Sequence, residues 1–397
     1  MMQPTQSLDL WRIRLYFFLW FGAGGFLIPF ITLFYKARGL SGSEIGLLSA
    51  IGWTVSLLIA PLWGRWSDAR RDQRRLLQAG LLGSAACILV LSQQRLFVWM
   101  VIIIAVESLA SAAIEPLSNV QALAITRGDK WMFGSVRLWG SLGWALTAPL
   151  CGWLIERLGL TSAFVGYAAA ALAGALTLQF VSLMGGYKVQ EGEPRLPLRV
   201  VLAGLAKNRL MAGLAVTLFL LWLSGAGRQQ FESIYMTQLG AKEGVIGMLN
   251  TVGALIELPA MLWADRLVGR FGSGRIFGLS LVMQFAATAT VVIAPSIPSI
   301  FILRAASGVY FSLYTAASIA YTTEGAPAQQ RATVLTLYYT TLRGIVILIA
   351  SPLSGIAFDW LGAYPLYVIA MVGTFLAWLV FVISRINKPV LSRPMEV

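Results

Sequence analysis

Apolar residues run in twelve long segments along the chain, and short polar stretches separate these segments. Each segment is about 20 residues long, which is the length that an α-helix needs to cross the hydrocarbon core of a membrane. The segments lie at residues 14–35, 43–63, 76–93, 96–124, 132–155, 161–185, 210–236, 244–264, 275–294, 298–323, 331–358 and 362–384. The pattern therefore predicts an all-α membrane protein with twelve transmembrane helices.

A longer polar stretch divides the twelve segments into two sets of six. Its sequence, GYKVQEGEPRLPLRVVLAGLAKN, has the charges and prolines of a loop. We therefore expect an N-terminal six-helix bundle over residues 1–185, a cytoplasmic central loop over 186–208 and a C-terminal six-helix bundle over 209–397.

The composition supports a membrane protein and narrows its chemistry. Hydrophobic residues make up 58% and charged residues 12% of the 397 residues, and the mean hydropathy is +0.75. Soluble domains hold about 25% charged residues. The chain has no His, and its two cysteines, Cys87 and Cys151, lie inside apolar segments. We therefore expect no cofactor, no metal site and no enzymatic centre of a recognisable kind.

The basic residues follow the expected membrane topology. The net charge is +13. If both termini are cytoplasmic, the cytoplasmic segments hold 21 of the 30 Lys and Arg residues, the external loops hold 5 and the helices hold 4. An excess of this kind on one side fixes the orientation of a membrane protein. We expect a multi-pass protein of the cell (inner) membrane, embedded in the lipid bilayer, with both termini in the cytoplasm and no nucleic acid partner.

The two halves of the sequence repeat a short motif. PLWGRWSDARRDQRR (61–75) and PAMLWADRLVGRFGSGR (259–275) each follow the second predicted helix of their half, and Asp68 and Asp265 lie 197 residues apart. These loops resemble the signature loop of the major facilitator superfamily. The resemblance implies two pseudo-symmetric six-helix bundles around one central site that opens to alternate sides by rocking. We expect a monomer, with both aspartates in a gating or charge network.

A narrower resemblance covers nearly the whole chain. GGFLIPF (24–30), FGSVRLWGSLGWAL (133–146) and RQQFESIY (228–235) are similar to segments of the lactose permease and of its phenylpropionate permease-like and nucleoside–proton symporter-like relatives. This resemblance places Arg137 on the essential sugar-binding arginine and Trp144 on the sugar-stacking tryptophan. In these relatives a proton gradient drives uptake of a sugar, a nucleoside or an aromatic acid.

The chain departs from the lactose permease at several functional positions. The binding glutamate of the fourth helix falls on Asn119, and that of the eighth helix falls on Ala254, three residues before Glu257. The histidine and glutamate that handle protons, the aspartate of the seventh helix and the lysine of the tenth fall on Ser307, Tyr310, Arg228 and Arg304. The resemblance therefore carries over the scaffold, but neither galactoside specificity nor the proton relay.

Eight charged residues lie inside the predicted helices, and their signs balance. They are Arg137, Arg228, Arg304, Arg343, Glu107, Glu115, Glu232 and Glu257. An isolated charge is costly at that depth, so four arginines and four glutamates predict mutual pairing. On this count the core has no positive excess that would by itself demand an anionic substrate.

The fourth predicted helix has a polar face. Glu107, Ser111, Glu115 and Asn119 follow one another at four-residue spacing, which places them on one side of a helix. Pro116 frees a backbone carbonyl, and we expect a kink beside a wet cavity. Asn119 is expected to contact the substrate, whereas Glu107 and Glu115 fit either that face or structural ion pairs.

The seventh predicted helix carries a second polar group. Arg228 and Glu232 can pair within this helix, and Arg304 of the tenth helix lies at a similar depth. We expect this trio to form an external gate, although a purely structural network fits the same residues. Gln229 and Gln230 offer hydrogen-bond donors and acceptors to a substrate, and at least one is expected to face the cavity.

Any proton carrier must be a carboxylate, because the chain has no His. Glu257, near mid-membrane in the eighth helix, is the first candidate for proton coupling, ahead of Glu232 and Glu115. Burial and a neighbouring arginine act in opposite directions on the proton affinity of a carboxylate. Arg137 and Arg343 of the charge network lie at comparable depth, so a movement of either could switch that affinity.

Trp144 lies seven residues, or two helical turns, beyond Arg137, so both side chains share one face. An aromatic ring beside a forked donor suits a sugar or a planar ring. The residues expected to bind substrate are therefore Arg137, Trp144, Asn119, Gln229, Gln230 and Glu257.

The leading functional prediction is a proton-coupled symporter that imports a small polar organic solute, such as a sugar, a nucleoside or an aromatic acid. An efflux antiporter is the alternative. The Arg and Trp of the fifth helix favour the symporter, because exporters of the superfamily usually carry a Gly/Pro-rich signature there. A non-transporting receptor on the same scaffold is a third interpretation.

Overall fold

The computed structural model describes residues 4–69, 73–127, 129–182, 204–205, 208–326 and 330–386. These residues are helical apart from short connections, and no strand occurs among them. Twelve helical stretches are long and apolar enough to cross a membrane. The predicted all-α fold with twelve spans is confirmed. Most of the expected central loop, residues 186–208, lies outside the described residues.

The first six spans are built from the helices of the N-terminal half. They are α1 (Pro4–Leu27), α2 (Ile31–Ala37), α3 (Gly42–Ala69), α4 (Gln73–Ser92), α5 (Phe97–Ser111), α6 (Ile114–Ile125), α7 (Lys130–Leu158) and α8 (Thr161–Leu178). The pair α1 and α2 forms one interrupted span, and the pair α5 and α6 forms another.

The last six spans come from the C-terminal half. They are built from α10 (Arg209–Gln238), α11 (Glu243–Phe271), α12 (Ser273–Ile293), α13 (Ile297–Gly325), α14 (Arg331–Thr336), η2 (Leu337–Leu342), α15 (Arg343–Leu361) and α16 (Tyr364–Ile386). The π-helical turn η2 joins α14 to α15 within a single span.

The break between α5 and α6 has a local cause. Pro116 lies in the first turn of α6 and has no N–H to bond the carbonyl of Ala112, so the regular helix is interrupted there. The helix interruption that the sequence predicts at Pro116 is therefore present, but no residue of this span lines the cavity described below, so the expected position beside a wet cavity is wrong. The η2 turn contains no proline, and the sequence pattern does not predict it.

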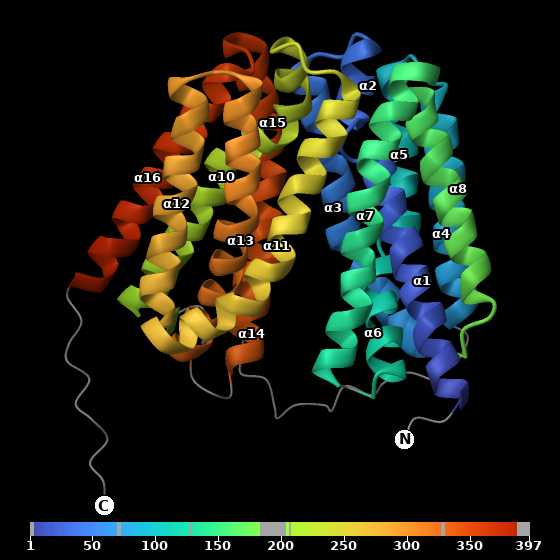
Figure 1. Ribbon diagram of the computed structural model, residues 1–397, viewed down its shortest axis with the longest axis horizontal. Helices are drawn as coiled ribbons and strands as arrows, with labels where there is room; N and C mark the ends of the chain where they lie inside the picture. Colours follow the sequence, from blue (N-terminus) through green and yellow to red (C-terminus); the bar gives the residue numbers. More distant parts are fainter. Residues whose placement is uncertain are drawn as a thin grey trace, which may run out of the picture.

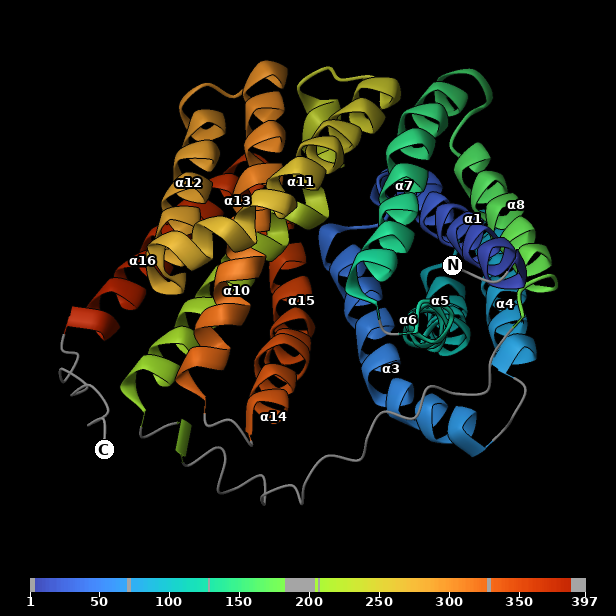
Figure 2. The same ribbon diagram turned by 60° about the horizontal axis from the view of Figure 1, so that its bottom comes forward.

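The two halves lie side by side, with α1–α8 on one side and α10–α16 on the other (Figure 1). α1 begins and α16 ends at the same face of the molecule, which we call the terminal face. Across the boundary α7 packs against α11 and α3 packs against α15 (Figures 1 and 2). α7 and α11 meet towards the opposite face and diverge towards the terminal face.

Glycines bring the backbones of the two halves into close contact near the opposite face. A Cβ atom on Gly152 of α7 would clash with the carbonyl oxygen of Glu243, and one on Gly247 of α11 would clash with that of Ala148. Only glycine permits so close an approach of two backbones.

Hydrogen bonds also join the halves at the opposite face. Asp359, near the end of α15, accepts hydrogen bonds from the backbone N–H groups of Gly42 (2.6 Å) and Ser43 (2.8 Å) at the start of α3. The backbone N–H of Gly244 donates to Oε1 of Glu156 over 2.8 Å. The opposite face is thus closed by hydrogen bonds in which a carboxylate of one half accepts from backbone N–H groups of the other half.

Candidate functional site

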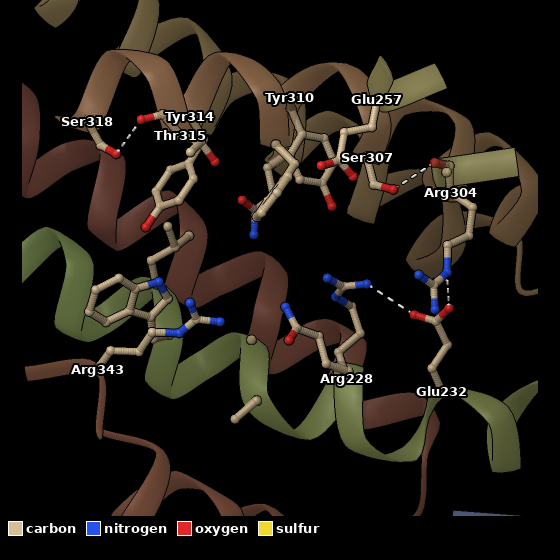
Figure 3. A pocket seen from close by; sticks show the side chains of 18 of the residues that line it. Arg228, Glu232, Glu257, Arg304, Ser307, Tyr310, Tyr314, Thr315, Ser318 and Arg343 are labelled. Carbon is tan, nitrogen blue, oxygen red and sulfur yellow. Dashed lines mark hydrogen bonds and ion pairs between the residues drawn. The ribbon is translucent and has the colours of Figure 1, made fainter. Parts of the chain in front are cut away.

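A cavity of about 540 Å³ lies mainly in the C-terminal half. It is lined from α10, α11, α12, α13, η2 and α15, and Trp144 of α7 is the one lining residue contributed by the described part of the N-terminal half. Figure 3 shows its polar side chains pointing towards one another. The charged, amide and aromatic residues of the lining are Arg228, Glu232, Glu257, Arg304, Arg343, Gln229, Asn250, Gln284, Trp144, Trp222, Tyr310, Phe311, Tyr314 and Tyr339.

Glu232 joins two arginines at one end of the cavity (Figure 3). It accepts a hydrogen bond from Nη1 of Arg228, one turn earlier in α10, over 3.2 Å, and another from Nε of Arg304 in α13. Glu232 is only 2% exposed and Arg228 is 6% exposed. The three side chains therefore form the contacts expected of the trio, and they bind α10 to α13.

Arg228 retains free hydrogen-bonding capacity beside the cavity. Its guanidinium bonds Glu232 through Nη1 and also interacts with the Tyr310 hydroxyl, but its buried Nε has no partner among the described residues. A buried donor without a partner is costly, so a ligand acceptor placed here would satisfy it.

Glu257 lies on α11 where this helix packs tightly on α13. A Cβ atom on Gly308 would lie 2.8 Å from the backbone nitrogen of Glu257, and Oγ of Ser312 donates to the carbonyl of Glu257 over 3.2 Å. The backbone is thus fixed. The carboxylate lines the cavity, forms no ion pair within the described residues, and interacts electrostatically with Arg137 of α7.

The structure separates the two residues expected to act together on α7. Trp144 lines the cavity. Arg137 is exposed and is not part of the lining; its guanidinium lies 5.7 Å from the ring centroid of Phe21. Arg137 therefore reaches the site in this conformation through its charge, and its partner in that interaction is Glu257.

The two glutamines of α10 point to different surroundings. Gln229 lines the cavity. Gln230 instead donates from Nε2 to Oγ of Ser49 in α3, over 3.3 Å, across the boundary between the halves. One of the two amides thus faces the cavity, and the other helps to join the halves.

The polar face of the fourth span does not reach the cavity. Glu107 accepts a hydrogen bond from Oγ of Ser84 over 2.7 Å, and Ser84 also bonds the hydroxyl of Tyr167 over 2.6 Å. Glu115 is exposed. Oδ1 of Asn119 is buried and lacks a hydrogen-bond partner in the described part of the chain. None of the three carboxyl or amide side chains belongs to the lining of the cavity.

The expectation that four arginines pair with four glutamates is wrong. Within the described residues, Glu232 is the only one of the four glutamates in an ion pair, and it takes two arginines. Glu107 accepts a hydrogen bond from the Ser84 hydroxyl and forms no pair with an arginine in the described residues. Glu115 and Glu257 are not fully buried, so they need an arginine partner less. Equal depth in the membrane does not place two side chains on facing sides of their helices.

The expectation of balanced charge is wrong for the cavity as well. Its lining holds three arginines, Arg228, Arg304 and Arg343, but two glutamates, Glu232 and Glu257. The cavity therefore has a positive excess, because the other two glutamates lie elsewhere.

Arg343 stands at the other end of the cavity from the trio (Figure 3). It is exposed, directly follows the η2 turn, and forms no ion pair within the described residues. Its charge acts on Tyr314 of α13, whose buried hydroxyl interacts with Trp222 and has no acceptor for its own proton among the described residues. This end thus presents a guanidinium without an ion pair and a hydroxyl that can still donate.

The repeated aspartates lie away from the cavity lining. Asp265 is exposed on α11. The side chain of Asp68 lies outside those that the structure describes. Their part in a gating network stays a prediction.

The sequence pattern did not predict several residues of the cavity lining, among them Trp222, Tyr314 and Gln284. The first two carry a signal that could have found them: Trp222 lies seven residues before Gln229, and Tyr314 lies seven after Ser307, so each shares a helix face with a position already singled out. Gln284 on α12 has no such neighbour.

The chain matches the family described as "MFS_1 like family" over residues 10–369. It is 28% identical to the maltose permease of Geobacillus stearothermophilus over 83% of each chain. It is 26% identical to the multidrug resistance protein MdtG of Proteus mirabilis (strain HI4320), over 69% of this chain and 72% of the relative.

Two further likenesses cover more of the chain. A probable 3-phenylpropionic acid transporter of Escherichia coli (strain K12) is 24% identical over 91% of this chain and 94% of the relative. The crystal structure of the nucleoside transporter NupG superposes with a TM-score of 0.83 at 15% identity, covering 96% of this chain and all of that one (100%). At this low sequence identity, the similarity to NupG shows a shared fold alone.

Proposed function

Because the chain belongs to the MFS_1 like family of membrane transporters, we propose that it is a proton-coupled symporter. It imports a small polar organic solute, such as a sugar, a nucleoside or an aromatic acid, by alternating access. The observation that carries this proposal is the polar cavity, which is lined by a carboxylate, Glu257, that forms no ion pair within the described residues.

The conformation of the molecule, which is closed at one face and open at the other, supports alternating access. Asp359, Gly42 and Ser43 close the opposite face, while α7 and α11 diverge towards the terminal face. We take the terminal face to be cytoplasmic, because most Lys and Arg residues fall on that side. With this orientation the structure is inward-facing, and we propose that the protein works as a monomer in the inner membrane. Rocking of the halves would break the Asp359 contacts and open the other side.

Proton coupling follows from the placement of Arg137 and Glu257 in different halves. A guanidinium favours the ionised form of a nearby carboxylate. Rocking changes the distance between the halves, and with it the influence of Arg137 on Glu257. The carboxylate would thus bind and release its proton on different sides of the membrane within one cycle.

The trio of Arg228, Glu232 and Arg304 fits the role of a gate. It lies towards the closed face, at the end of the cavity opposite to Arg343. A substrate group that binds the free Nε of Arg228 would compete with Glu232 for the guanidinium. Substrate occupancy would then loosen the link between α10 and α13.

Export by proton antiport is the second candidate, since one relative is named a multidrug resistance protein. Counterflow in proteoliposomes tests for transport, and uptake under a pH gradient separates the two. For counterflow, vesicles loaded with unlabelled maltose, uridine or 3-phenylpropionate are given the labelled compound outside without a pH gradient. For the direction of coupling, unloaded vesicles are given the labelled compound outside with a pH gradient of either sign. A symporter accumulates its substrate when the outside is acidic. Accumulation only when the inside is acidic would favour the antiporter, and no counterflow beyond protein-free vesicles would exclude transport of these classes.

A further inference from the structure

We propose that the substrate is an organic anion with a planar ring, and that Arg343 binds its acid group. The subsite consists of Arg343, Tyr314, Trp222 and Tyr339, and we call it the Arg343 subsite. This inference rests on the proposed transport function and names the substrate class of the same cavity.

The first argument is charge. Arg228 and Arg304 share the carboxylate of Glu232, and Glu257 interacts with Arg137. Arg343 is the lining arginine for which the described residues supply no carboxylate. A positive charge inside a membrane protein is normally matched by a counter-charge. An anionic ligand would provide it.

The second argument is hydrogen bonding. The oxygen of the buried Tyr314 hydroxyl interacts with the indole N–H of Trp222, but the hydroxyl proton has no acceptor among the described residues, and Figure 3 shows the hydroxyl directed to the side of the cavity where Arg343 lies. A guanidinium has donors and no acceptor, and a phenol has one donor. Two donors that converge in this way suit a carboxylate, which accepts hydrogen bonds on both oxygens.

The third argument is the aromatic wall. Trp222 of α10 and Tyr339 of η2 meet edge to face, with ring centroids 6.3 Å apart. Phe311 and Tyr314 of α13 stack with the same separation. Such surfaces favour contact with a planar ring. A sugar presents hydroxyls on several sides and would need acceptors as well as donors at this end of the cavity.

The backbone beside Arg343 is also unusual. The η2 turn ends at Leu342 and carries Tyr339, so the π-helical turn supplies one member of the subsite and directly precedes another. π-helical turns within α-helices are rare and frequently mark functional sites.

The test is equilibrium dialysis of purified protein against labelled 3-phenylpropionate, 4-hydroxybenzoate and indole-3-acetate, each compared with its uncharged primary amide, and against uridine and maltose. We expect at least one carboxylate to bind about tenfold or more tightly than its amide, as for the loss of a charged hydrogen bond. Arg343→Gln should remove this preference, and Tyr314→Phe should weaken carboxylate binding. Arg157→Gln changes an exposed arginine far from the cavity and should have no effect.

The experiment distinguishes failure of the Arg343 subsite from failure of the proposed transport function. If uridine or maltose binds while no carboxylate is preferred over its amide, the anion subsite is wrong and the transport function stands. A folded, monodisperse Arg343→Gln protein that keeps the wild-type preference for a carboxylate also overturns the subsite. If no compound binds and none gives counterflow, the proposed function falls together with it.

Discussion

Arg137 of α7 acts on the carboxylate of Glu257 of α11 although the two residues belong to different halves of the molecule. No ion pair joins them in the part of the chain that the structure describes. The interaction is therefore electrostatic and sensitive to the separation of the halves. It connects the rocking motion to a group that can carry a proton.

Glu257→Gln should uncouple transport from protons. The amide keeps the shape of the protonated acid but cannot ionise, so substrate exchange should continue at a rate comparable with wild type. Uptake against a substrate gradient, driven by an acidic exterior, should be lost. Both rates are measured in the same proteoliposomes. Uphill accumulation by the variant would remove Glu257 from the proton path, and Glu232 and then Glu115 would be tested in the same way.

Arg137 is expected to act through its charge, since it is not part of the cavity lining. Arg137→Lys should therefore keep most of the uphill uptake, because a lysine retains the charge. Arg137→Gln should abolish it while leaving counterflow measurable. Equal loss in both variants would instead point to bidentate binding by the guanidinium, which lysine cannot reproduce.

Trp144 should contribute to binding through its ring. It lines the cavity, and its ring also lies 3.0 Å from where a Cβ atom on Gly24 would be. Trp144→Phe should weaken substrate binding by about two- to threefold and Trp144→Ala by about tenfold or more, as stacking is reduced and then removed. Dissociation constants from dialysis test this. Unchanged affinity in both variants would make Trp144 a packing residue.

Glu232 should be more important for stability than Arg304. Glu232→Gln leaves two arginines without their carboxylate, one of them buried, and should cost about 3–5 kcal/mol. Arg304→Gln keeps the pair of Arg228 and Glu232, and the Arg304 side chain is 27% exposed, so a smaller loss of about 1.5–3 kcal/mol, that of one charged hydrogen bond, is expected. Thermal unfolding in detergent compares the two. A smaller loss for Glu232→Gln would contradict the central place of this carboxylate.

Asp359 should hold the opposite face closed. Asp359→Ala removes the acceptor for the N–H groups of Gly42 and Ser43 and should raise the outward-open population. The reporter is Thr251→Cys, at a position that bonds α7 across the boundary, in a chain with Cys87→Ser and Cys151→Ser. A membrane-impermeant maleimide added from the opposite face should label this cysteine faster in the Asp359→Ala protein than in the same reporter protein that keeps Asp359. An unchanged rate would show that other contacts keep this face closed.

The spans were predictable because membrane insertion depends on local composition. Length and apolarity alone identify twelve helices, and Pro116 locates a kink because a proline lacks one N–H. The η2 turn was not predictable in this way, since no proline or glycine marks residues 337–342.

The charge network was harder to predict, because pairing depends on which way each helix face turns. The contact of Arg228 with Glu232 is local to one helix, and the spacing predicts it. Glu107 instead meets Ser84 and Tyr167, which are distant in sequence. A count of the charges at each membrane depth does not show such contacts. It therefore did not predict that the cavity has a positive excess.

Substrate-induced proton movement tests proton-coupled symport most directly. Maltose, uridine and 3-phenylpropionate are added in turn to lightly buffered proteoliposomes while the external pH is recorded, with protein-free and Glu257→Gln vesicles as controls. For the transported compound, symport predicts alkalinisation of the medium beyond both controls, because protons enter with the substrate. Acidification, or transport with no pH change beyond the controls, would contradict proton-coupled symport.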